Sequence, residues 1–539
     1  MASALTDFLR LARTGVVLAQ HGVRFVPAGT PTPWPLTLLR WATWPLRAMA
    51  WLLSPATARS GRLARALTRL GPSYIKLGQF LATRRDLISA ELADDLTELQ
   101  DKLPPFPMSE TRRVVEEALG GRLEDHFVAF GPPVAAASIA QVHKAVVEEN
   151  GVRREVAVKV LRPGIERRFR GDLSSFFRAA RLIERLVPFS RRLKPVAVVE
   201  TLARSVELEM DLRLEAAAIS EMADNITGDR SLPDGAFRVP AVDWRRTARR
   251  LLTIEWIDGI PVRDVAAIEA AGLDRKQLGL VILRSFLRHA MRDGFFHADM
   301  HQGNLLVDRS GTVVAVDFGI VGRLGPRERR FLAEILHGLI TRDYRRTAQV
   351  HFDAGYVPAH HSVEVFAQAM RAIGEPIHGR TADEISMADL LGQLFAYTEV
   401  FDMETRPELL LLQKTMVVVE GVARALDPEL NMWVAAEPIA KAWVEANLGV
   451  AGRLKEAGEG AETFGRTLME LPRLMERAEG TALALAEMAR TGLRLDEATI
   501  AGLARAQAEQ TRGSRWIVGL AVLALAGIAA WMVLGGAVH

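Results

Sequence analysis

The chain of 539 residues is too long for one hydrophobic core, and its 49% hydrophobic and 25% charged residues are typical of a globular protein. Its formal net charge of +3 is too small to argue for nucleic acid as a partner. Cysteine is absent, which excludes disulfides, thiolate metal sites and cysteine nucleophiles. We therefore expect two or three subdomains that fold without redox chemistry.

The first 130 residues are predicted to be mainly helical. Residues 1–60 contain no secretory signal, because charged side chains interrupt the apolar runs. Within them, residues 34–53 combine four tryptophans with leucines and two arginines. This composition suits a helix in a membrane interface, and an ordinary packed helix is the alternative. Residues 61–130 are predicted to form a helical extension, because leucines from Leu87 to Leu103 recur at helical spacing.

Residues 131–257 are predicted to form a small mixed lobe. From 131 to 162 the pattern indicates strands, with a tight turn at 149–151 and valines that alternate with other residues up to Leu161. Residues 163–225 return to helix, and Leu251 to Ile257 form a further strand. The Asp258-Gly259 pair that follows is a plausible connector to a second lobe.

Residues 258–510 are predicted to form a larger helical lobe with additional helices, and residues 340–510 show no feature beyond a helical scaffold. Ile517 to Val538 is an apolar run of 22 residues without a charge, against the roughly 20 that a bilayer core requires. Trp516 and two arginines precede it, as interfacial anchors do. Residues 511–539 are therefore predicted to be a C-terminal transmembrane anchor with the preceding part in the cytoplasm; a buried core helix is the alternative.

A kinase-like catalytic pattern lies between residues 297 and 319. Asp299 and Asn304 keep the D-x-x-x-x-N spacing of a kinase catalytic loop, and Asp317 opens a D-F-G triplet. Leu305–Val307 and Thr312–Val316 read as the two strands of a hairpin, which would bring Asn304 and Asp317 together as oxygen ligands for the Mg²⁺ of bound ATP. Asp299 would then orient or deprotonate the attacking water or hydroxyl group.

The nucleotide phosphates and adenine have candidate contacts upstream of this pattern. Lys159, in a V-A-V-K strand, can reach the α- and β-phosphates of ATP if a helix carboxylate steadies it, and Glu215 is the candidate. Glu255 to Ile257, at the connector between lobes, are expected to meet adenine through backbone groups. An alanine-rich segment replaces the glycine-rich loop, and its candidate nucleotide contacts are Ala135, Ala136, Ala137, Ser138 and Val142.

Three departures from an ordinary protein kinase disfavour a protein substrate. Alanine stiffens the loop that glycine would leave free, so nucleotide affinity or metal preference should differ. Ala298 stands where arginine usually precedes the catalytic aspartate. The segment after Asp317 runs almost directly into a helix, with no A-P-E sequence and little room for a peptide platform.

Over roughly residues 60–330 the chain resembles the UbiB/ADCK family of atypical kinase-like proteins, which support coenzyme Q (ubiquinone) biosynthesis. The family usually has prolines where this chain has Met300 and Gln302, which affects the loop backbone and leaves the ligand spacing intact. The matching motifs are K-x-G-Q at Lys76-Leu77-Gly78-Gln79, the alanine-rich loop at Ala135 to Ser138, E-x-D at Glu209-Met210-Asp211, the helix carboxylate Glu215, and H-x-D-x-H-x-x-N at His297, Asp299, His301 and Asn304.

The resemblance implies an α+β, atypical protein-kinase-like two-lobe fold. It also implies regulation, in which the helix bearing Lys76 and Gln79 covers the substrate position and Lys76 lies near the acids Glu209 and Asp211. The resemblance implies that a lysine there favours ATP hydrolysis over protein phosphorylation. On a regular helix Glu209 lies about 200° from Asp211, so both acids meet one lysine only if the helix is distorted or Glu209 has a different partner.

The sequence thus predicts a membrane-anchored ATPase at the cytoplasmic face of a bacterial inner membrane, using ATP and Mg²⁺. Its expected role is ATP-driven handling of lipid quinone precursors, with membrane lipid, polyprenylated quinone precursors and enzymes of ubiquinone biosynthesis as partners, and no nucleic acid. A small-molecule or lipid phosphotransferase and a nucleotide-gated, non-catalytic scaffold are the alternatives. A hydroxylase finds no support, because there is no flavin fingerprint and no iron triad is evident among the twelve histidines.

Overall fold

The computed structural model describes residues 2–21, 61–82, 95–96, 99, 103–186, 194–228, 236–378, 397, 400–403 and 407–448. The chain divides into two compact units, Met1–Ala446 and Asn447–His539, and nearly all the described residues belong to the first. The expected interface helix at 34–53 and the expected anchor at 511–539 lie outside the described residues. Among those that are described, no helix is long and apolar enough to cross a membrane.

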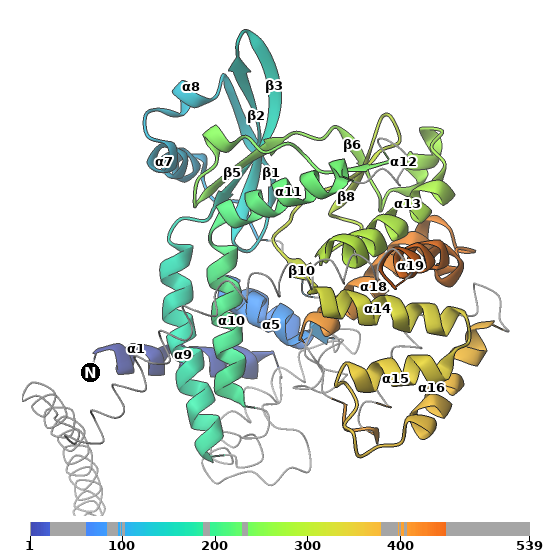
Figure 1. Cartoon of the computed structure of the whole chain (residues 1–539). Coiled ribbons are helices and arrows are strands. Elements are labelled where there is room, and N and C mark those ends of the chain that lie inside the picture. Colours follow the sequence, from blue (N-terminus) through green and yellow to red (C-terminus); the bar gives the residue numbers. More distant parts are fainter. Residues whose placement is uncertain are drawn as a thin grey trace, which may run out of the picture. The chain divides into compact units, whose positions relative to one another are not determined.

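The smaller lobe is built on a four-stranded antiparallel sheet in the order β1-β2-β3-β5 (Figure 1). Its strands are β1 Ala129–Ala136, β2 Ala140–Glu149, β3 Val152–Leu161 and β5 Leu251–Glu255. The alternating valines of β3 are buried and pack against α7 (Met108–Leu119) and α8 (Leu123–His126). The predicted strands over 131–162 are confirmed, and Lys159 falls on the face opposite the valines.

Three helices follow β3, and the chain leaves the helical conformation between the second and the third, at the E-x-D acids Glu209 and Asp211. They are α9 Ile165–Leu186, α10 Pro195–Glu209 and α11 Leu212–Thr227. Asp211 is the N-cap of α11, and its side chain accepts a hydrogen bond from the Arg213 N–H. The helix is therefore interrupted between the two acids, which is one of the alternatives that the sequence left open: α10 ends at Glu209, and α11 begins after Asp211.

The larger lobe contains the predicted hairpin and the helices that support it. In the hairpin Leu305 pairs with Ala315, as expected. A second four-stranded sheet has the order β4-β9-β8-β6, and β7 pairs with β10. The elements are β4 Phe237–Arg238, β6 Gly259–Pro261, α12 Val265–Ala270, α13 Arg275–Arg288, the π-helical turn η4 His289–Asp293, β7 Phe295–His297, β8 Leu305–Asp308, β9 Val313–Ala315 and β10 Val321–Arg323. The 3-10 helix η3 Trp244–Arg246 belongs to the smaller lobe, where it contacts β5.

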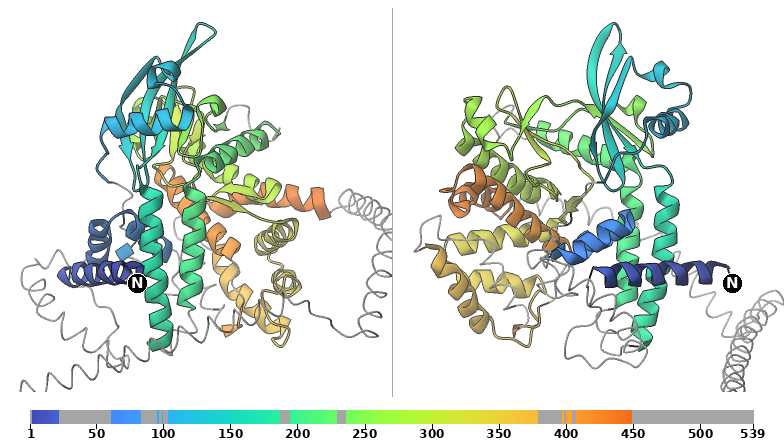
Figure 2. Two further views of the ribbon diagram at one scale, coloured as in Figure 1. Left: turned by 90° about the vertical axis from the view of Figure 1, so that its left-hand side faces the viewer. Right: turned by 180° about the vertical axis from the view of Figure 1, so that it is seen from behind.

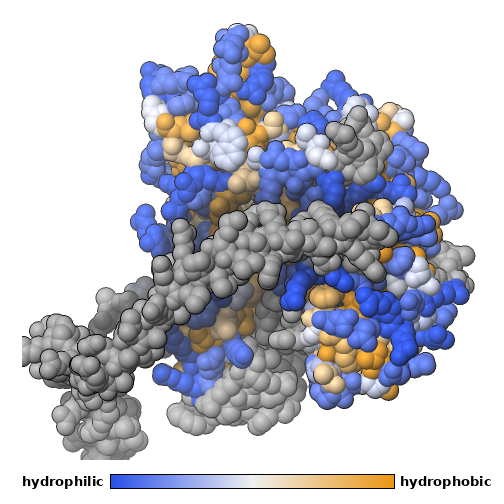
Figure 3. Space-filling model, in the orientation of Figure 1, coloured by the Kyte–Doolittle hydropathy of each residue, from blue (hydrophilic) through white to orange (hydrophobic). Residues whose placement is uncertain are grey.

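Helices make up the described chain beyond residue 325, as predicted. They are α14 Pro326–Ile340, α15 Tyr344–Asp353, α16 Val363–His378, α18 Pro407–Leu426 and α19 Met432–Leu448. α18 packs against α13 in the main core, whereas α15 and α16 form a separate apolar cluster that includes Phe366 and Phe401. In the view of Figure 3 the described surface is mainly hydrophilic, with apolar residues in small groups.

The N-terminal helices attach to α9 and α10. They are α1 Ala2–Gln20, α4 Arg62–Leu70 and α5 Pro72–Ala82, and Figure 2 shows α1 lying across α9. Asp7 of α1 is buried and forms an ion pair of 2.8 Å with Arg178 of α9. In α5, a Cβ at Gly78 would lie 2.3 Å from Leu99 Cδ1 and 2.7 Å from Leu67 Cδ1. Only glycine therefore lets α5 pack this closely.

Candidate functional site

The structure brings Lys159, Glu215 and Asp317 together from β3, α11 and the D-F-G segment. Lys159 Nζ lies 2.9 Å from Glu215 Oε1 and 3.0 Å from Glu215 Oε2, and it also donates to Asp317 Oδ1 at 2.9 Å. The side chains of Lys159 and Glu215 are only 17% and 7% exposed. One ammonium group therefore holds both the helix carboxylate and the carboxylate predicted to bind the metal.

Burial and charge act in opposite directions on this triad. Burial alone would lower the pKa of Lys159, but the charges of Asp317 and Glu215 outweigh it and hold that pKa above its ordinary value. Burial raises the pKa of Glu215 to about 7, although the Lys159 charge opposes the shift. The Lys159 charge keeps the pKa of Asp317 below its ordinary value. Lys159 and Asp317 are therefore charged at neutral pH, whereas Glu215 is close to its midpoint.

Because the pKa of Glu215 is about 7, we expect kcat/KM for ATP to fall as the pH decreases below that value. Protonated Glu215 no longer carries the charge that holds Lys159 toward the phosphates. Glu215→Gln, which is neutral at every pH, should give a lower kcat/KM that stays flat through this range. The measurement is the pH profile of kcat/KM for both proteins, with Glu221→Gln on the exposed side of α11 as the control. A flat profile for the unmodified protein would contradict the assignment.

The hairpin places the two predicted metal ligands at its base. The Val316 N–H donates to Asn304 O at 2.9 Å, so Asn304 and Asp317 start from adjacent backbone positions. Asn304 is 8% exposed, and its side-chain nitrogen donates to Asp299 O at 3.1 Å, which leaves the amide oxygen as the ligand atom. An amide oxygen and a carboxylate are the hard donors that Mg²⁺ prefers, so this pair fits the ion.

Two histidines hold the backbone of the catalytic loop. His297 Nδ1 accepts from the Asp299 N–H at 3.0 Å, so its protonated Nε2 donates to Val316 O at 3.1 Å. Burial lowers the pKa of His297, which favours this neutral form. His301 Nδ1 accepts from the Gly303 N–H at 3.0 Å, and its Nε2 lies 3.7 Å from Asp299 Oδ2. His297 thus joins the loop to the hairpin, and His301 faces the Asp299 carboxylate.

A residue that the sequence reasoning missed supports the same loop from α18. Thr415 is 1% exposed, and its hydroxyl lies 3.1 Å from Ala298 O and 2.8 Å from Leu411 O. The one hydroxyl proton is shared between a bond within α18 and a bond to the residue before Asp299. In the sequence, Thr415 appears only as a threonine within an apolar helical run, and nothing in that run indicates Ala298 as its partner.

Thr415→Val should lower kcat roughly fivefold, because losing a hydrogen bond of about 1 kcal/mol loosens the loop that carries Asp299. ATP affinity should change little, since Thr415 lies behind the loop. The measurement is kcat together with the dissociation constant for ATP. Thr201→Val is the matched control, because Thr201 makes the same bond within its own helix, to Ala197 O, at an exposed position. An unchanged kcat would show that Ala298 O does not need this partner.

The alanine-rich loop is held in a fixed turn beside Lys159. Ala137 O accepts from the Arg162 guanidinium at 3.0 Å and 2.9 Å, and the Ala137 N–H donates to Ala140 O at 2.8 Å. Val142 is the cross-strand partner of Lys159, so it lies on the same face of the sheet. Nucleotide contact by Ala135 to Ser138 and by Val142 stays a prediction, which their position at this end of the sheet allows.

The connector between lobes has fewer free backbone N–H donors than the predicted adenine contact requires. The Glu255 N–H donates to Ala241 O at 2.8 Å, and the Trp256 N–H donates to Glu155 O at 3.1 Å. The Glu255 carboxylate accepts two bonds of 3.0 Å from Arg238. The backbone donors at 255 and 256 are thus already used within the protein, and the adenine contact predicted for Ile257 stays a prediction.

Lys76 of α5 pairs with one of the two E-x-D acids. Its Nζ lies 2.7 Å from Glu209 Oε2, with both side chains largely buried. Asp211 instead pairs with Arg213 at 2.6 Å, so the two acids have different partners. After Lys159, the Lys76 charge also contributes to lowering the pKa of Asp317. Lys76 is therefore close enough to Asp317, the predicted metal ligand, for its charge to affect that carboxylate. Gln79 is half-buried and lies one turn further along α5.

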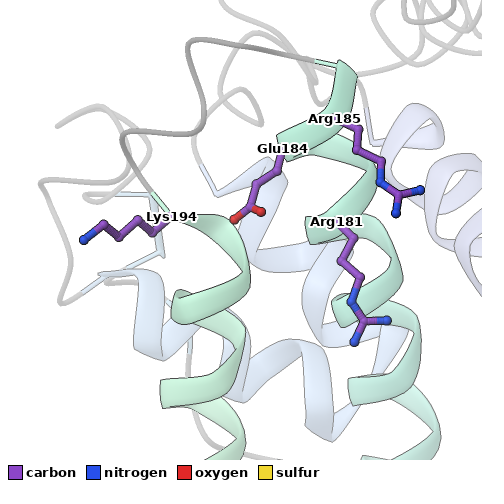
Figure 4. A pocket seen from close by; sticks show the side chains of 4 residues that line it. All are labelled: Arg181, Glu184, Arg185 and Lys194. Atoms are coloured by element: carbon purple, nitrogen blue, oxygen red, sulfur yellow. The ribbon is translucent and has the colours of Figure 1, made fainter. Parts of the chain in front are cut away.

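A separate basic cavity of about 550 Å³ lies at the C-terminal end of α9 (Figure 4). It is lined by Arg181, Glu184, Arg185 and Lys194, at a distance of about 25 Å along α9 from the end of β3. Glu184 accepts from the Val196 N–H at 3.0 Å and so caps α10, whose N-cap residue provides no side-chain bond. The remaining side chains that line the cavity are all positively charged.

Comparisons with known proteins agree with this geometry. The ABC1 atypical kinase-like domain matches residues 98–351, and the UbiB helical domain matches residues 370–431. The second match covers Thr415 and its neighbours in α18, so the helix that supports the catalytic loop is itself part of a recognised domain.

Curated relatives match over most of their length. Proteins described as "Probable protein kinase UbiB" are 39% identical in Marinobacter nauticus, covering 86% of this chain and 83% of the relative, and 40% identical in Xanthomonas euvesicatoria, covering 76% and 74%. A solved structure, the complex of Rv3197 and erythromycin from Mycobacterium tuberculosis, is 25% identical with a TM-score of 0.46, covering 69% of this chain and 93% of that chain. On the domains and relatives together, this chain belongs to the UbiB family of atypical kinase-like proteins.

Proposed function

We propose that the protein is an ATP-hydrolysing enzyme that supports ubiquinone biosynthesis by ATP-driven handling of lipid quinone precursors. Membership of the UbiB family implies the pathway. The observation that carries the hydrolytic activity is the ion pair of 2.7 Å between Lys76 and Glu209 beside the kinase-like centre. On this proposal, the Lys76 ammonium, whose charge acts on Asp317, would occupy the region where an ordinary kinase receives its acceptor.

The segment after Asp317 supports water as the acceptor. β10 ends at Arg323 and α14 begins at Pro326, so the chain provides little length for a peptide-binding platform. Asp299 would orient water and accept its proton as the bond between the β-γ bridging oxygen and the γ-phosphorus breaks, giving ADP and inorganic phosphate. When bound, Mg²⁺ neutralises charge on the phosphates. Lys159, steadied by Glu215, would fix the phosphates for this step.

Association with the inner membrane is part of the proposal. The apolar run Ile517 to Val538 is long enough to span a bilayer, and polyprenylated precursors stay within one. The positively charged cavity at Arg181, Arg185 and Lys194 supports contact with anionic headgroups. Removing residues 512–539 should release the protein from vesicles of bacterial lipid in a flotation assay. Full retention would place the attachment elsewhere in the chain.

The deciding experiment follows the γ-phosphate of labelled ATP, with purified full-length protein, bacterial lipid and a soluble quinone-precursor mimic. Label released as free phosphate by the unmodified protein, but not by Asp317→Asn, would support the ATPase. Label on lipid, mimic or protein would favour a phosphotransferase, in line with the printed description of the relatives as probable protein kinases. ATP binding without turnover would favour the non-catalytic scaffold.

Lys76→Ala tests the ion pair between Lys76 and Glu209, on which the proposed hydrolysis rests. Removing the ammonium should change the ratio of free phosphate to transferred label, because the acceptor region is no longer blocked by a cation. Lys276→Ala removes a surface lysine paired with Glu429 and provides the control. An identical ratio in Lys76→Ala would mean that Lys76 does not decide the acceptor.

A further inference from the structure

Two histidines and an aspartate gather in the larger lobe, outside the nucleotide site. His360 and His361 lie in the connection between α15 and α16 (Figure 1), and Asp402 lies shortly before α18. Asp402 Oδ2 is 3.6 Å from His360 Nε2 and 3.3 Å from His361 Nε2, and the candidate ligand atoms of all three residues lie within 4.8 Å of one another. Nothing in the sequence pattern indicated this cluster, because the fold joins residues about forty positions apart.

The distances within this cluster fit a shared cation, although the 3.3 Å contact between His361 and Asp402 is also within hydrogen-bonding distance. Zn²⁺ binds histidine nitrogen and carboxylate oxygen at about 2.0–2.2 Å, so the edge of its tetrahedron is about 3.3–3.6 Å. Octahedral coordination at similar bond lengths gives edges of only about 3.0 Å. The two nitrogen–oxygen separations thus correspond closely to tetrahedral edges.

The three side chains together supply the ligand types of a zinc site. The two imidazole rings lie with their centroids 4.2 Å apart, and a single carboxylate faces both. A divalent cation would take both imidazoles in their neutral form and use the carboxylate as its anionic ligand.

The backbone and the underlying core fix two of the three ligands. Asp402 has φ 48°, a left-handed conformation that aspartate adopts more readily than most residues. His361 is 21% exposed, and its ring packs edge-on against Phe401, which belongs to the apolar cluster of α15 and α16. His360 and Asp402 are 66% and 68% exposed, which leaves room for a water molecule as fourth ligand.

We propose that His360, His361 and Asp402 bind one divalent transition-metal ion, with Zn²⁺ as the best fit. Imidazole and carboxylate ligands suit this class of metal, and tetrahedral geometry selects Zn²⁺ within it. The metal clamps the connection between α15 and α16 to the chain that leads into α18. It is a structural clamp, independent of the proposed hydrolysis.

The test is a Zn²⁺ titration of metal-free full-length protein by calorimetry, without nucleotide. We expect one Zn²⁺ per chain, with affinity reduced at least tenfold in His360→Ala and in Asp402→Asn. Asparagine tolerates the left-handed backbone, so Asp402→Asn removes the charge with little strain. His337→Ala, which removes a histidine of α14, and Asp317→Asn, which alters the predicted nucleotide metal site, are the controls and should bind Zn²⁺ as the unmodified protein does.

Co²⁺ substitution tests the geometry independently of affinity. Co²⁺ in this site should give the intense visible absorption of tetrahedral coordination, and the absorption should disappear in His360→Ala. Thermal unfolding of the variants without metal should match that of the unmodified protein, and the stabilisation by Zn²⁺ should be lost only in the site variants. Absence of Zn²⁺ binding, equal affinity in Asp402→Asn, or loss of binding in Asp317→Asn would each overturn the proposal.

Discussion

Asp317→Asn should reduce Mg²⁺-dependent ATP turnover by on the order of a hundred- to a thousandfold. Asparagine keeps the size and one oxygen of the side chain but loses the negative charge, and it also breaks the 2.9 Å pair with Lys159. The measurement is phosphate release across a Mg²⁺ titration. High Mg²⁺ should restore part of the activity, because the remaining oxygen is a weaker ligand rather than an absent one.

Asp353→Asn is the matched control for this prediction. Asp353 ends α15, and its carboxylate accepts a surface hydrogen bond of 2.9 Å from Gln349. The control should leave turnover unchanged. If Asp317→Asn kept the activity of the unmodified protein at every Mg²⁺ concentration, Asp317 would not be a metal ligand.

Asp299→Asn should lower kcat by about a hundred- to ten-thousandfold while ATP affinity stays close to normal. The substitution should leave the loop conformation unchanged, because the contacts that shape the loop use the backbone of Asp299. Its N–H donates to His297, and its carbonyl accepts from Asn304. Only the carboxylate is lost. Single-turnover phosphate release, combined with equilibrium ATP binding, separates the chemical step from nucleotide affinity.

A variant that loses ATP binding and turnover together would indicate a disturbed loop rather than a missing base. A kcat within about threefold of the original would remove Asp299 from the chemical step altogether. Either result would leave the Mg²⁺ assignment of Asp317 intact, since the two predictions concern different atoms.

Local pattern was sufficient for the parts of the site that lie on one strand or one hairpin. Alternating valines fixed which face of β3 carries Lys159, and the spacing of Asn304 and Asp317 required a short hairpin, which the structure confirms. The pairing of Lys159 with Glu215 was also anticipated, although the resemblance to a family contributed to it.

Contacts between distant segments could not be predicted in the same way. The break between α10 and α11 depends on Asp211, whose side chain caps α11 instead of continuing the preceding helix. The helix propensity of the residues around Asp211 does not by itself decide between a cap and a continuous helix. Thr415 supports Ala298 across more than a hundred residues of sequence, and Asp402 meets His361 across forty. No periodicity encodes such partners, because they follow from tertiary packing.

The contact between Lys159 and Asp317 has a consequence for the order in which ligands arrive. The ammonium lies against the carboxylate that we propose as the Mg²⁺ ligand, so Asp317 is already neutralised and would offer little attraction to free Mg²⁺. On the proposed function, the phosphates of ATP would draw the lysine to themselves and release the carboxylate when the nucleotide enters. We therefore expect the metal to arrive together with ATP rather than ahead of it.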